Sequence, residues 1–231
     1  MANKNYYNNK YFRQRDNLDL LMAETLSTFA RERNIKTVLD VGCGTGQLVK
    51  FLNNRKFKAV GCDSQNEAIK IAEKINNPGQ IIKADINKLP FKKGSFDLVC
   101  AISVIEHLKK SETEEFIKEA NRILKKKGYI FLITPNFNSP FRPLSGKKWF
   151  AYSDPTHINF FDSNTISHLL EKNGFKNVSF RFNAPINTRL YWYNQAILKR
   201  LPAILIKIIN YILISSPLAL YRDSIWISAE K

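Results

Sequence analysis

Three glycines alternate with other residues in the segment VLDVGCGTGQL, which spans residues 38–48. Gly42, Gly44 and Gly46 follow a short apolar run, where they would let the main chain turn sharply and let a ligand lie directly against the backbone. Their spacing, G-x-G-x-G, differs from the G-x-G-x-x-G of a dinucleotide-binding loop, and no Gly-Lys-Ser/Thr follows as in a phosphate-binding loop. The segment therefore predicts a ligand-binding turn of another kind.

Three aspartates lie in or after successive apolar stretches that begin at this segment. Asp40 lies inside the first stretch, Asp63 at the end of the second, and Asp85 after the third, in KADINKLPF. A carboxylate at Asp63 could accept hydrogen bonds from both hydroxyls of a ribose, and one at Asp85 could meet the exocyclic amine of an adenine. Each acid alone is equally well explained as a solvated loop residue or a helix cap. All three at successive strand ends, with the glycines between them, favour a ligand site.

The elements that would position these residues alternate between apolar strands and amphipathic helices. Strands that are apolar throughout and alternate with helices indicate a parallel sheet covered on both faces. The sequence therefore predicts a doubly wound α/β fold, with a mostly parallel, seven-stranded Rossmann-like sheet, helices on both faces and a lid of helical and aromatic segments. The expected strands span residues 37–41, 57–62, 79–83, 96–102, 128–134, 177–183 and 223–229, and the expected helices span residues 16–33, 47–53, 66–75, 112–124, 163–173 and 188–216.

Further motifs follow the glycine turn in a fixed order: VGCDSQ, ADINKLPF, FDLVCAISVIEHL and NRILKKKGYIFLITPN. With the later HINFF and the closing DSIWISAEK, they resemble the class I S-adenosylmethionine-dependent methyltransferases, of the small-molecule type found in ubiquinone and menaquinone biosynthesis and in glycan gene clusters. The resemblance covers residues 35–175 well and the remainder loosely. It implies an enzyme that binds S-adenosylmethionine and releases S-adenosylhomocysteine.

The resemblance also assigns residues to each part of this cofactor. The implied contacts are Asp40, Gly42, Gly44 and Gly46 for the methionine portion, Asp63 for the ribose, Ser64 for the adenosine, Asp85 and Ile86 for the adenine, and Ile102 for the surroundings of the sulfur. The N-terminal aromatic residues Tyr6, Tyr7 and Tyr11 could close over the cofactor, although a loose terminus explains them equally well.

A chain of 231 residues without repeats or low-complexity linkers suits a single domain over residues 1–231. Within it we expect an N-terminal helical segment at 1–34, a cofactor-binding core at 35–134, and substrate-side insertions at 135–161 and 184–222. The three cysteines are too few and too widely spaced for a disulfide framework, so we expect buried thiols. Together with an N-terminus that lacks an apolar leader, they favour a cytoplasmic protein.

The histidines are the candidates for catalysis. A sulfonium already activates its methyl group, so the protein must mainly align the reacting atoms and exclude water, while a base assists if the acceptor is a hydroxyl. His107, in VIEHL, follows the fourth predicted strand, and the resemblance implies that it faces the active site. His157, in DPTHINFF, lies in the insertion over the pocket. Each histidine is a candidate base or a residue that binds the methyl acceptor, with a purely structural role as the alternative. His168 suits the surface of a helix.

Several absences narrow the acceptor. The Asn/Asp-Pro-Pro-aromatic motif of enzymes that methylate base amino groups is replaced by AISVIEH, and the Pro-Cys of enzymes that methylate cytosine carbon is missing. His and carboxylate residues show no metal-ligand spacing, so the sequence predicts no metal. A small-molecule or lipid- or glycan-linked acceptor, methylated at oxygen, is therefore the leading hypothesis.

The net charge of +16, from 36 basic and 20 acidic residues, keeps an RNA methyltransferase open as an alternative. The sequence has no recognisable RNA-binding module and no basic cluster interleaved with aromatic residues, so nucleic acid is not favoured as a partner. A cofactor-binding scaffold without catalytic activity is the second alternative, and the intact glycines and acids argue against it.

The C-terminal segment 199–221 is apolar over about the length of a membrane span, roughly 20 residues. Lys207 and Asn210 interrupt it, Pro217 would break the helix, and a span would separate strand 223–229 from its sheet, so we expect none. One reading is a lid helix packed over the sheet. The other is peripheral contact with a membrane, with Lys199, Arg200 and Lys207 near anionic headgroups.

Overall fold

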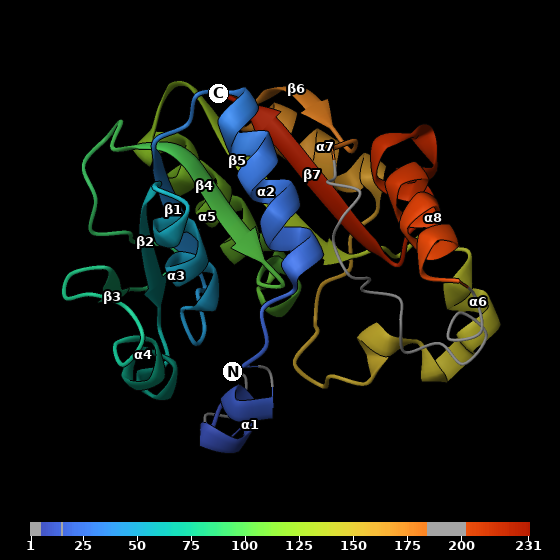
Figure 1. The fold of residues 1–231 in the computed structure, drawn as a ribbon, viewed down its shortest axis with the longest axis horizontal. Helices are drawn as coiled ribbons and strands as arrows, with labels where there is room; N and C mark the ends of the chain where they lie inside the picture. Colours follow the sequence, from blue (N-terminus) through green and yellow to red (C-terminus); the bar gives the residue numbers. More distant parts are fainter. Residues whose placement is uncertain (1–5, 15, 184–201) are drawn as a thin grey trace.

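The computed structural model describes residues 6–14, 16–183 and 202–231, and in these residues seven strands form one sheet (Figure 1). The strands are β1 (Thr37–Val41), β2 (Lys58–Asp63), β3 (Ile81–Lys83), β4 (Phe96–Ile102), β5 (Leu124–Pro135), β6 (Lys176–Ser179) and β7 (Ser224–Glu230). Their order is β3-β2-β1-β4-β5-β7-β6. Pairing is parallel from β3 to β5, whereas β7 is antiparallel to β5 and to β6. The predicted doubly wound, mostly parallel sheet is confirmed.

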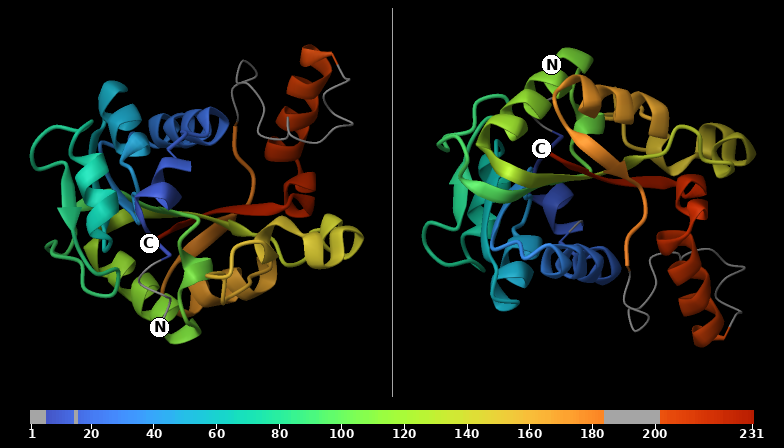
Figure 2. Two further views of the ribbon diagram at one scale, coloured as in Figure 1. Left: turned by 90° about the horizontal axis from the view of Figure 1, so that it is seen from below. Right: turned by 90° about the horizontal axis from the view of Figure 1, so that it is seen from above.

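Helices cover both faces of this sheet (Figure 2). On one side lie α2 (Leu20–Glu32), α3 (Gln47–Asn54) and α4 (Asn66–Ala72), and on the other lie α5 (Lys110–Ile123) and α7 (Ser163–Lys172). Neighbouring residues of one strand serve the two cores, since Val38 packs on the α2 side and Leu39 on the α5 side. A strand buried on both faces has this period of two, which explains why the central strands are apolar throughout.

The predicted boundaries of β1 and β4 are confirmed, most other elements differ from their predicted bounds by up to four residues, and two of these differences have a clear cause. The helix expected from residue 16 begins at Leu20, because the Asp19 side chain accepts a hydrogen bond from the Met22 N–H at 3.1 Å and caps the helix there. The strand expected at 177–183 ends at Ser179. Beyond it, the Phe182 N–H donates to the Ile214 carbonyl at 3.0 Å instead of joining the sheet.

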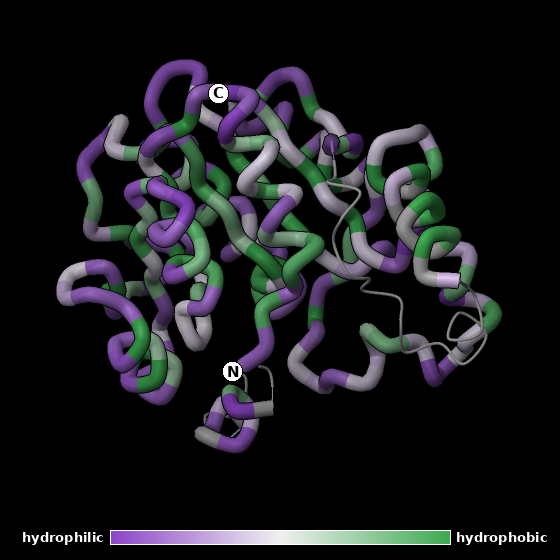
Figure 3. Tube along the Cα trace, viewed as in Figure 1, coloured by the Kyte–Doolittle hydropathy of each residue, from purple (hydrophilic) through white to green (hydrophobic). Residues whose placement is uncertain are grey.

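The helix expected over residues 188–216 is described only in part. Residues 188–201 lie outside the described chain, and α8 (Ala203–Ser215) forms the remainder. A short 3-10 helix, η6 (Pro217–Tyr221), begins at the proline predicted to break the helix. Apolar residues recur along α8 in Figure 3, yet no helix in the described residues is long and apolar enough to cross a membrane.

The expected excursion at residues 135–161 is folded at the edge of the sheet where the parallel strands have their carboxyl ends. It contains α6 (Phe141–Ser145) and the 3-10 turns η2 (Gly146–Lys148) and η3 (Phe150–Tyr152). Trp149, 1% exposed, packs against Tyr152 and Phe160 at its centre. The Ile158 and Asn159 N–H groups both donate to the backbone carbonyl of Glu106, at 2.9 and 3.1 Å, so the excursion is attached to the segment that follows β4.

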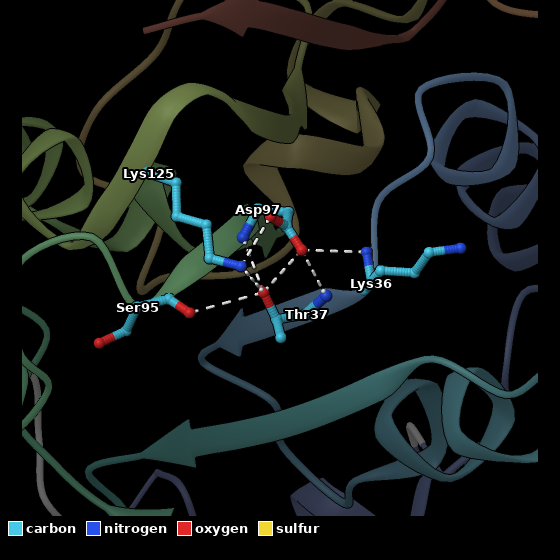
Figure 4. A network of polar contacts seen from close by, with 5 residues as sticks. All are labelled: Lys36, Thr37, Ser95, Asp97 and Lys125. Atoms are coloured by element: carbon cyan, nitrogen blue, oxygen red, sulfur yellow. Dashed lines mark hydrogen bonds and ion pairs between the residues drawn. The ribbon is translucent and has the colours of Figure 1, made fainter.

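Asp97 joins three strands at the amino end of the sheet (Figure 4). One carboxylate oxygen accepts from the backbone N–H groups of Lys36 and Thr37 and from the Thr37 hydroxyl, at 3.0, 2.8 and 2.8 Å, and the other pairs with the Lys125 ammonium at 2.8 Å. Burial opposes ionisation, but the bonds from Lys125 and Thr37 outweigh it and lower the pKa of Asp97 to about 2. This network lies at the opposite edge of the sheet from the glycine turn.

Replacing Asp97 by asparagine should lower the free energy of unfolding by about 2 kcal/mol at pH 7, the equivalent of the difference between a pKa of about 2 and the ordinary 3.8. Because the folded-state pKa lies below the unfolded-state value, this stabilisation is complete above pH ~4 and is lost as the pH falls towards 2. Urea unfolding of both proteins at pH 7 and pH 3 measures the difference. An equal loss of stability at both pH values would contradict the assignment.

Candidate active site

A cavity of about 860 Å³ opens at the carboxyl ends of β1, β2 and β4, on the side of the sheet where α1 (Asn9–Gln14) lies in Figure 1. The strand order reverses between β1 and β4, and open α/β sheets bind ligands at such a reversal. All of the sequence-predicted site residues except Gly46 line this cavity. They are Asp40, Gly42, Gly44, Asp63, Ser64, Asp85, Ile86, Ile102, His107 and His157.

The three glycines of the turn have different physical roles. All three have positive φ angles, of 71°, 51° and 77° for Gly42, Gly44 and Gly46. A Cβ on Gly44 would meet no heavy atom within 4 Å, so this backbone is open to a ligand. A Cβ on Gly46 would lie 2.5 Å from the Asn76 amide nitrogen and 2.9 Å from the Ala72 Cβ. Gly46 therefore permits close packing against the end of α4, and its predicted contact with the cofactor stays a prediction.

Asp63 holds the glycine turn in place from the end of β2. One of its carboxylate oxygens accepts from the Gly44 N–H at 3.0 Å and the other from the Gln65 N–H at 2.8 Å. Burial raises its pKa, against the effect of these backbone bonds. The carboxylate thus lies beside bare backbone with acceptor capacity remaining, an arrangement suited to a diol.

Asp40 is a buried acid directly below the turn. Asp40 is 3% exposed, and one of its carboxylate oxygens lies 3.6 Å from the Cys100 sulfur. Burial raises the pKa of Asp40 to about 7, despite the bond from Cys100. A cationic group bound in the cavity would stabilise the carboxylate and lower this pKa again. The other buried thiols, Cys43 and Cys62, confirm the expectation of free cysteines inside the protein.

The polar groups in the half of the cavity that contains the glycine turn fit S-adenosylmethionine. That molecule combines an amino-acid end with an ammonium group, a positively charged sulfur, a ribose diol and an adenine ring. The open backbone at Gly44 and the raised pKa of Asp40 suit the amino-acid end, the Asp63 carboxylate suits the ribose, and the Asp85–Ile86 loop lines the cavity where the adenine would lie. Ile102, at the end of β4, leads from this half of the cavity towards the histidines.

An acid and both candidate histidines converge in the other half. Glu106, His107 and His157 each place an oxygen or nitrogen atom within 4.8 Å of the other two, and the two imidazole rings lie 4.7 Å apart. Glu106 is 1% exposed, one of its oxygens accepts from the Thr134 hydroxyl at 3.1 Å, and its other oxygen has no hydrogen-bond partner among the described residues. Burial raises the pKa of Glu106 to about 8.

The sequence spacing gave no sign of this cluster, because His157 lies far along the chain from the other two residues. A carboxyl group with a pKa of about 8 is largely protonated at pH 7. A carboxyl group in this state and two imidazoles can hold or exchange a proton, and the same three groups are of the types that could bind a metal ion.

Each imidazole is held through its Nδ1 atom. His107 Nδ1 lies 2.8 Å from the Thr156 hydroxyl and 3.3 Å from the Tyr7 hydroxyl, and His157 Nδ1 lies 2.7 Å from the Ala151 carbonyl. Tyr7 and the neighbouring Tyr11 also line the cavity. The sequence indicated these histidines and tyrosines but missed Glu106, whose position in the apolar stretch SVIEHL was the available signal.

Comparison with protein families and curated proteins supports a cavity that binds S-adenosylmethionine. Residues 11–180 match the methyltransferase-domain family. An uncharacterised protein of Methanocaldococcus jannaschii, MJ1252, is 39% identical over 129 residues, which cover 55% of this chain and 45% of that protein. The ubiquinone biosynthesis O-methyltransferase of Pelagibacter ubique is 32% identical over 108 residues, with coverage of 45% and 43%. The probable tRNA methyltransferase 9B of Mus musculus is 33% identical over 96 residues, with coverage of 41% and 21%.

In each of these three relatives, the chain matches less than half of the relative's length. Among solved structures, a S-adenosylmethionine-dependent methyltransferase from Archaeoglobus fulgidus superposes with a TM-score of 0.61 at 22% identity, covering 90% of this chain and 94% of that one. That likeness concerns the fold, while the family match spans most of the chain. The chain belongs to the methyltransferase-domain family, as a class I S-adenosylmethionine-dependent methyltransferase domain.

Proposed function

We propose that this protein transfers the methyl group of S-adenosylmethionine to an oxygen atom of a small-molecule acceptor, lipid- and glycan-linked molecules included. The observation that carries the proposal is the convergence of Glu106, His107 and His157 in the same cavity as the glycine turn. The cofactor, when bound, supplies a methyl group activated by a positively charged sulfur. The residues of the chain then align the acceptor, exclude water and handle its proton.

The two halves of the cavity divide this work. On the cofactor side we assign Asp40, Gly42 and Gly44 to the methionine portion and Asp63 to the ribose. Ser64, Asp85 and Ile86 would contact the adenosine, and Ile102 the surroundings of the sulfur. The contact predicted for Gly46 stays a prediction, because this residue does not line the cavity.

On the acceptor side, His107 takes the proton of the acceptor hydroxyl as the new bond forms. The acceptor O–H bond breaks, its electron pair stays on the oxygen, and that oxygen would take the methyl group that the bound cofactor supplies. His157 lies within reach of the same proton. The folded excursion at 135–161 and the region 184–222 would enclose the acceptor, which makes them the substrate-side insertions of a single domain; residues 184–201 lie outside the described chain.

Asp63→Ala should weaken S-adenosylmethionine binding roughly a hundredfold, because it removes a charged acceptor of hydrogen bonds. Gly44→Val should abolish binding, because its side chain would enter the space left open for the ligand. Titration calorimetry measures both affinities. Asp97→Asn is the matched control, a partly buried acid at the opposite edge of the sheet, and should keep wild-type affinity. Unchanged affinity in both site variants would refute the cofactor assignment.

Binding of S-adenosylmethionine should weaken as the pH falls below about 7, by up to tenfold for each pH unit, because Asp40 takes up a proton there. The positive charge of S-adenosylmethionine favours the ionised Asp40 carboxylate. Binding at pH 6 should therefore release a proton from Asp40. Calorimetry in two buffers of different ionisation enthalpy measures that proton. Asp40→Asn should remove the pH dependence along with much of the affinity, and an unaltered dependence in this variant would show that another group is responsible.

His107→Ala and His157→Ala should each lower turnover by roughly a hundredfold or more without weakening S-adenosylmethionine binding, because a base acts on the acceptor and not on the cofactor. His168→Ala is the control, since His168 is exposed on α7. Full activity in both site variants would exclude a histidine base and favour transfer to carbon or catalysis by proximity alone.

A screen of acceptors with radiolabelled methyl donor identifies the substrate, and it should include phenolic and sugar compounds, a membrane lipid extract and total tRNA. Labelling of the lipid or small-molecule fraction supports the proposal. The RNA alternative draws on the charge of +16 and on the relative named as a probable tRNA methyltransferase, and label in tRNA would establish it. High-affinity cofactor binding without transfer to any fraction would favour the scaffold.

Membrane contact through α8 would bring a lipid-linked acceptor to the cavity. The exposed side chains Ile204, Leu205, Ile208 and Ile212 give this helix an aliphatic face, and Lys147 and Lys148 are exposed on η2. An aliphatic face suits a membrane interface, and exposed basic residues would favour an anionic one. The alternative is a lid. Lys199 and Arg200 lie outside the described residues, and the side chains of Lys207 and Asn210 are not described, so their predicted stripe stays a prediction.

The protein should float with anionic liposomes at low salt and less so at high salt, and the double variant Ile208→Glu/Ile212→Glu should lose this binding because both changed side chains lie on the aliphatic face. Leu20→Glu is the control, an exposed leucine at the start of α2. A folded wild type that fails to float at either salt concentration would leave only the lid.

A further inference from the structure

Asp154 reaches the candidate base through a neighbouring hydroxyl. We propose that Asp154 is a positioning residue: acting through Thr156, it holds the proton of the His107 ring on Nδ1, so that Nε2 is the nitrogen that accepts the acceptor's proton. The proposal deepens the proposed function and rests on it for the role of His107 as a base. The arrangement of the three side chains stands on the structure itself.

The connection consists of two short hydrogen bonds that meet at one hydroxyl. The Thr156 hydroxyl lies 2.6 Å from an Asp154 carboxylate oxygen and 2.8 Å from His107 Nδ1. The Thr156 N–H donates to the same carboxylate oxygen at 2.9 Å, which fixes the hydroxyl relative to the acid.

The direction of these bonds follows from what each group can donate. The pKa of Asp154 is lowered because, although burial opposes ionisation, the bonds from Thr156 and the nearby histidines favour the carboxylate, which can only accept. The Thr156 hydroxyl has one hydrogen, and it points to Asp154. The bond between Thr156 and His107 must therefore use a hydrogen on Nδ1. The Thr156 carbonyl, 3.3 Å from the same Nδ1, can also only accept, and it favours the same tautomer.

Burial and backbone hydrogen bonds hold Asp154 and Thr156 in place next to His107. Asp154 and Thr156 are 8% and 7% exposed. The Ile158 and Asn159 N–H groups donate to the carbonyl of Glu106, the residue before His107, at 2.9 and 3.1 Å. The segment that carries the acid is thus attached to the segment that carries the base.

Other titratable groups also face the His107 ring. From the N-terminal segment, the Tyr7 hydroxyl lies 3.3 Å from Nδ1, and burial raises its pKa, so it is neutral at pH 7. Glu106, on the same 3-10 turn (η1, Ile105–His107), is largely neutral for the same reason. His157 contacts the ring from the excursion, and Glu112, from α5, lines the cavity and accepts from the Lys109 N–H.

The charge of Asp154 therefore acts on the ring through a hydrogen-bonded path. When Nε2 gains the acceptor's proton, the imidazolium that forms is stabilised by this carboxylate, and the Nδ1 hydrogen stays in place. A carboxylate that fixes a histidine tautomer in this way raises the basicity of the opposite nitrogen.

The test is NMR of the protein labelled with ¹⁵N-histidine and saturated with S-adenosylhomocysteine, in which the chain's three histidines give few resonances. His157→Asn and His168→Asn assign them. The wild-type His107 ring should carry its proton on Nδ1. Thr156→Val should populate the other tautomer, and Thr156→Ser, which retains the hydroxyl, should restore the wild-type pattern. Asp154→Asn should move the titration midpoint of His107 to lower pH by about one unit, because an anionic neighbour is lost.

A wild-type ring protonated on Nε2, or a Thr156→Val spectrum that matches the wild type, would overturn the proposal. The wild-type spectrum decides even if that variant fails to fold. These readings need no acceptor, so they separate this proposal from the proposed function. Once an acceptor is known, Thr156→Val should lower turnover at least tenfold. The turnover of Thr156→Ser should stay near that of the wild type. A switched tautomer with unchanged turnover would confirm the hydrogen-bonded path and refute His107 as the base.

Discussion

The site depends on the reversal of strand order between β1 and β4. Because the two strands are parallel neighbours whose connections leave in opposite directions, the chain cannot cover the carboxyl end between them. The glycine turn leaves β1 on one side of this gap, and the segment SVIEH leaves β4 on the other. One feature of the topology thereby places a cofactor-binding turn and a histidine in the same cavity.

Burial then tunes the groups that this topology brings together. Asp40 and Glu106 both lie in the cavity wall, and their pKa values are raised to about 7 and about 8 because each carboxyl is removed from water. Asp97, an acid of the same sheet with four donors around it, has a pKa lowered to about 2. The acid at the amino edge stabilises the fold, whereas the two at the carboxyl edge remain able to respond to a cation or a proton.

The sequence predicted the sheet, and it predicted residues that line one half of the cavity, because both depend on local patterns. Apolar strands, alternating helices, three glycines and the acids at strand ends are all read within a few residues of one another. Gly46 does not line the cavity, because it lies close to Ala72 and Asn76, at and just beyond the end of α4. The early end of β6 was missed for a similar reason, since Phe182 is drawn to Ile214 by a tertiary contact.

The acceptor side could be predicted only in part. His107 and His157 were recognisable one at a time, but their meeting with Glu106 depends on how the excursion returns to the end of β4. The Ile158 and Asn159 N–H bonds to Glu106 determine that return, and no pattern of spacing encodes them. Asp154 and Thr156 became candidates only when the return placed them behind the His107 ring.

We propose that the methyl donor and the acid–histidine cluster share one cavity, with the sulfur between Ile102 and His107. A crystal structure with S-adenosylhomocysteine bound tests it most directly. We expect the ribose hydroxyls to bind Asp63, the amino-acid end to lie against the backbone at Gly44, and the sulfur to face His107. S-adenosylhomocysteine bound with its sulfur directed away from this cluster, or bound outside the cavity, would contradict it.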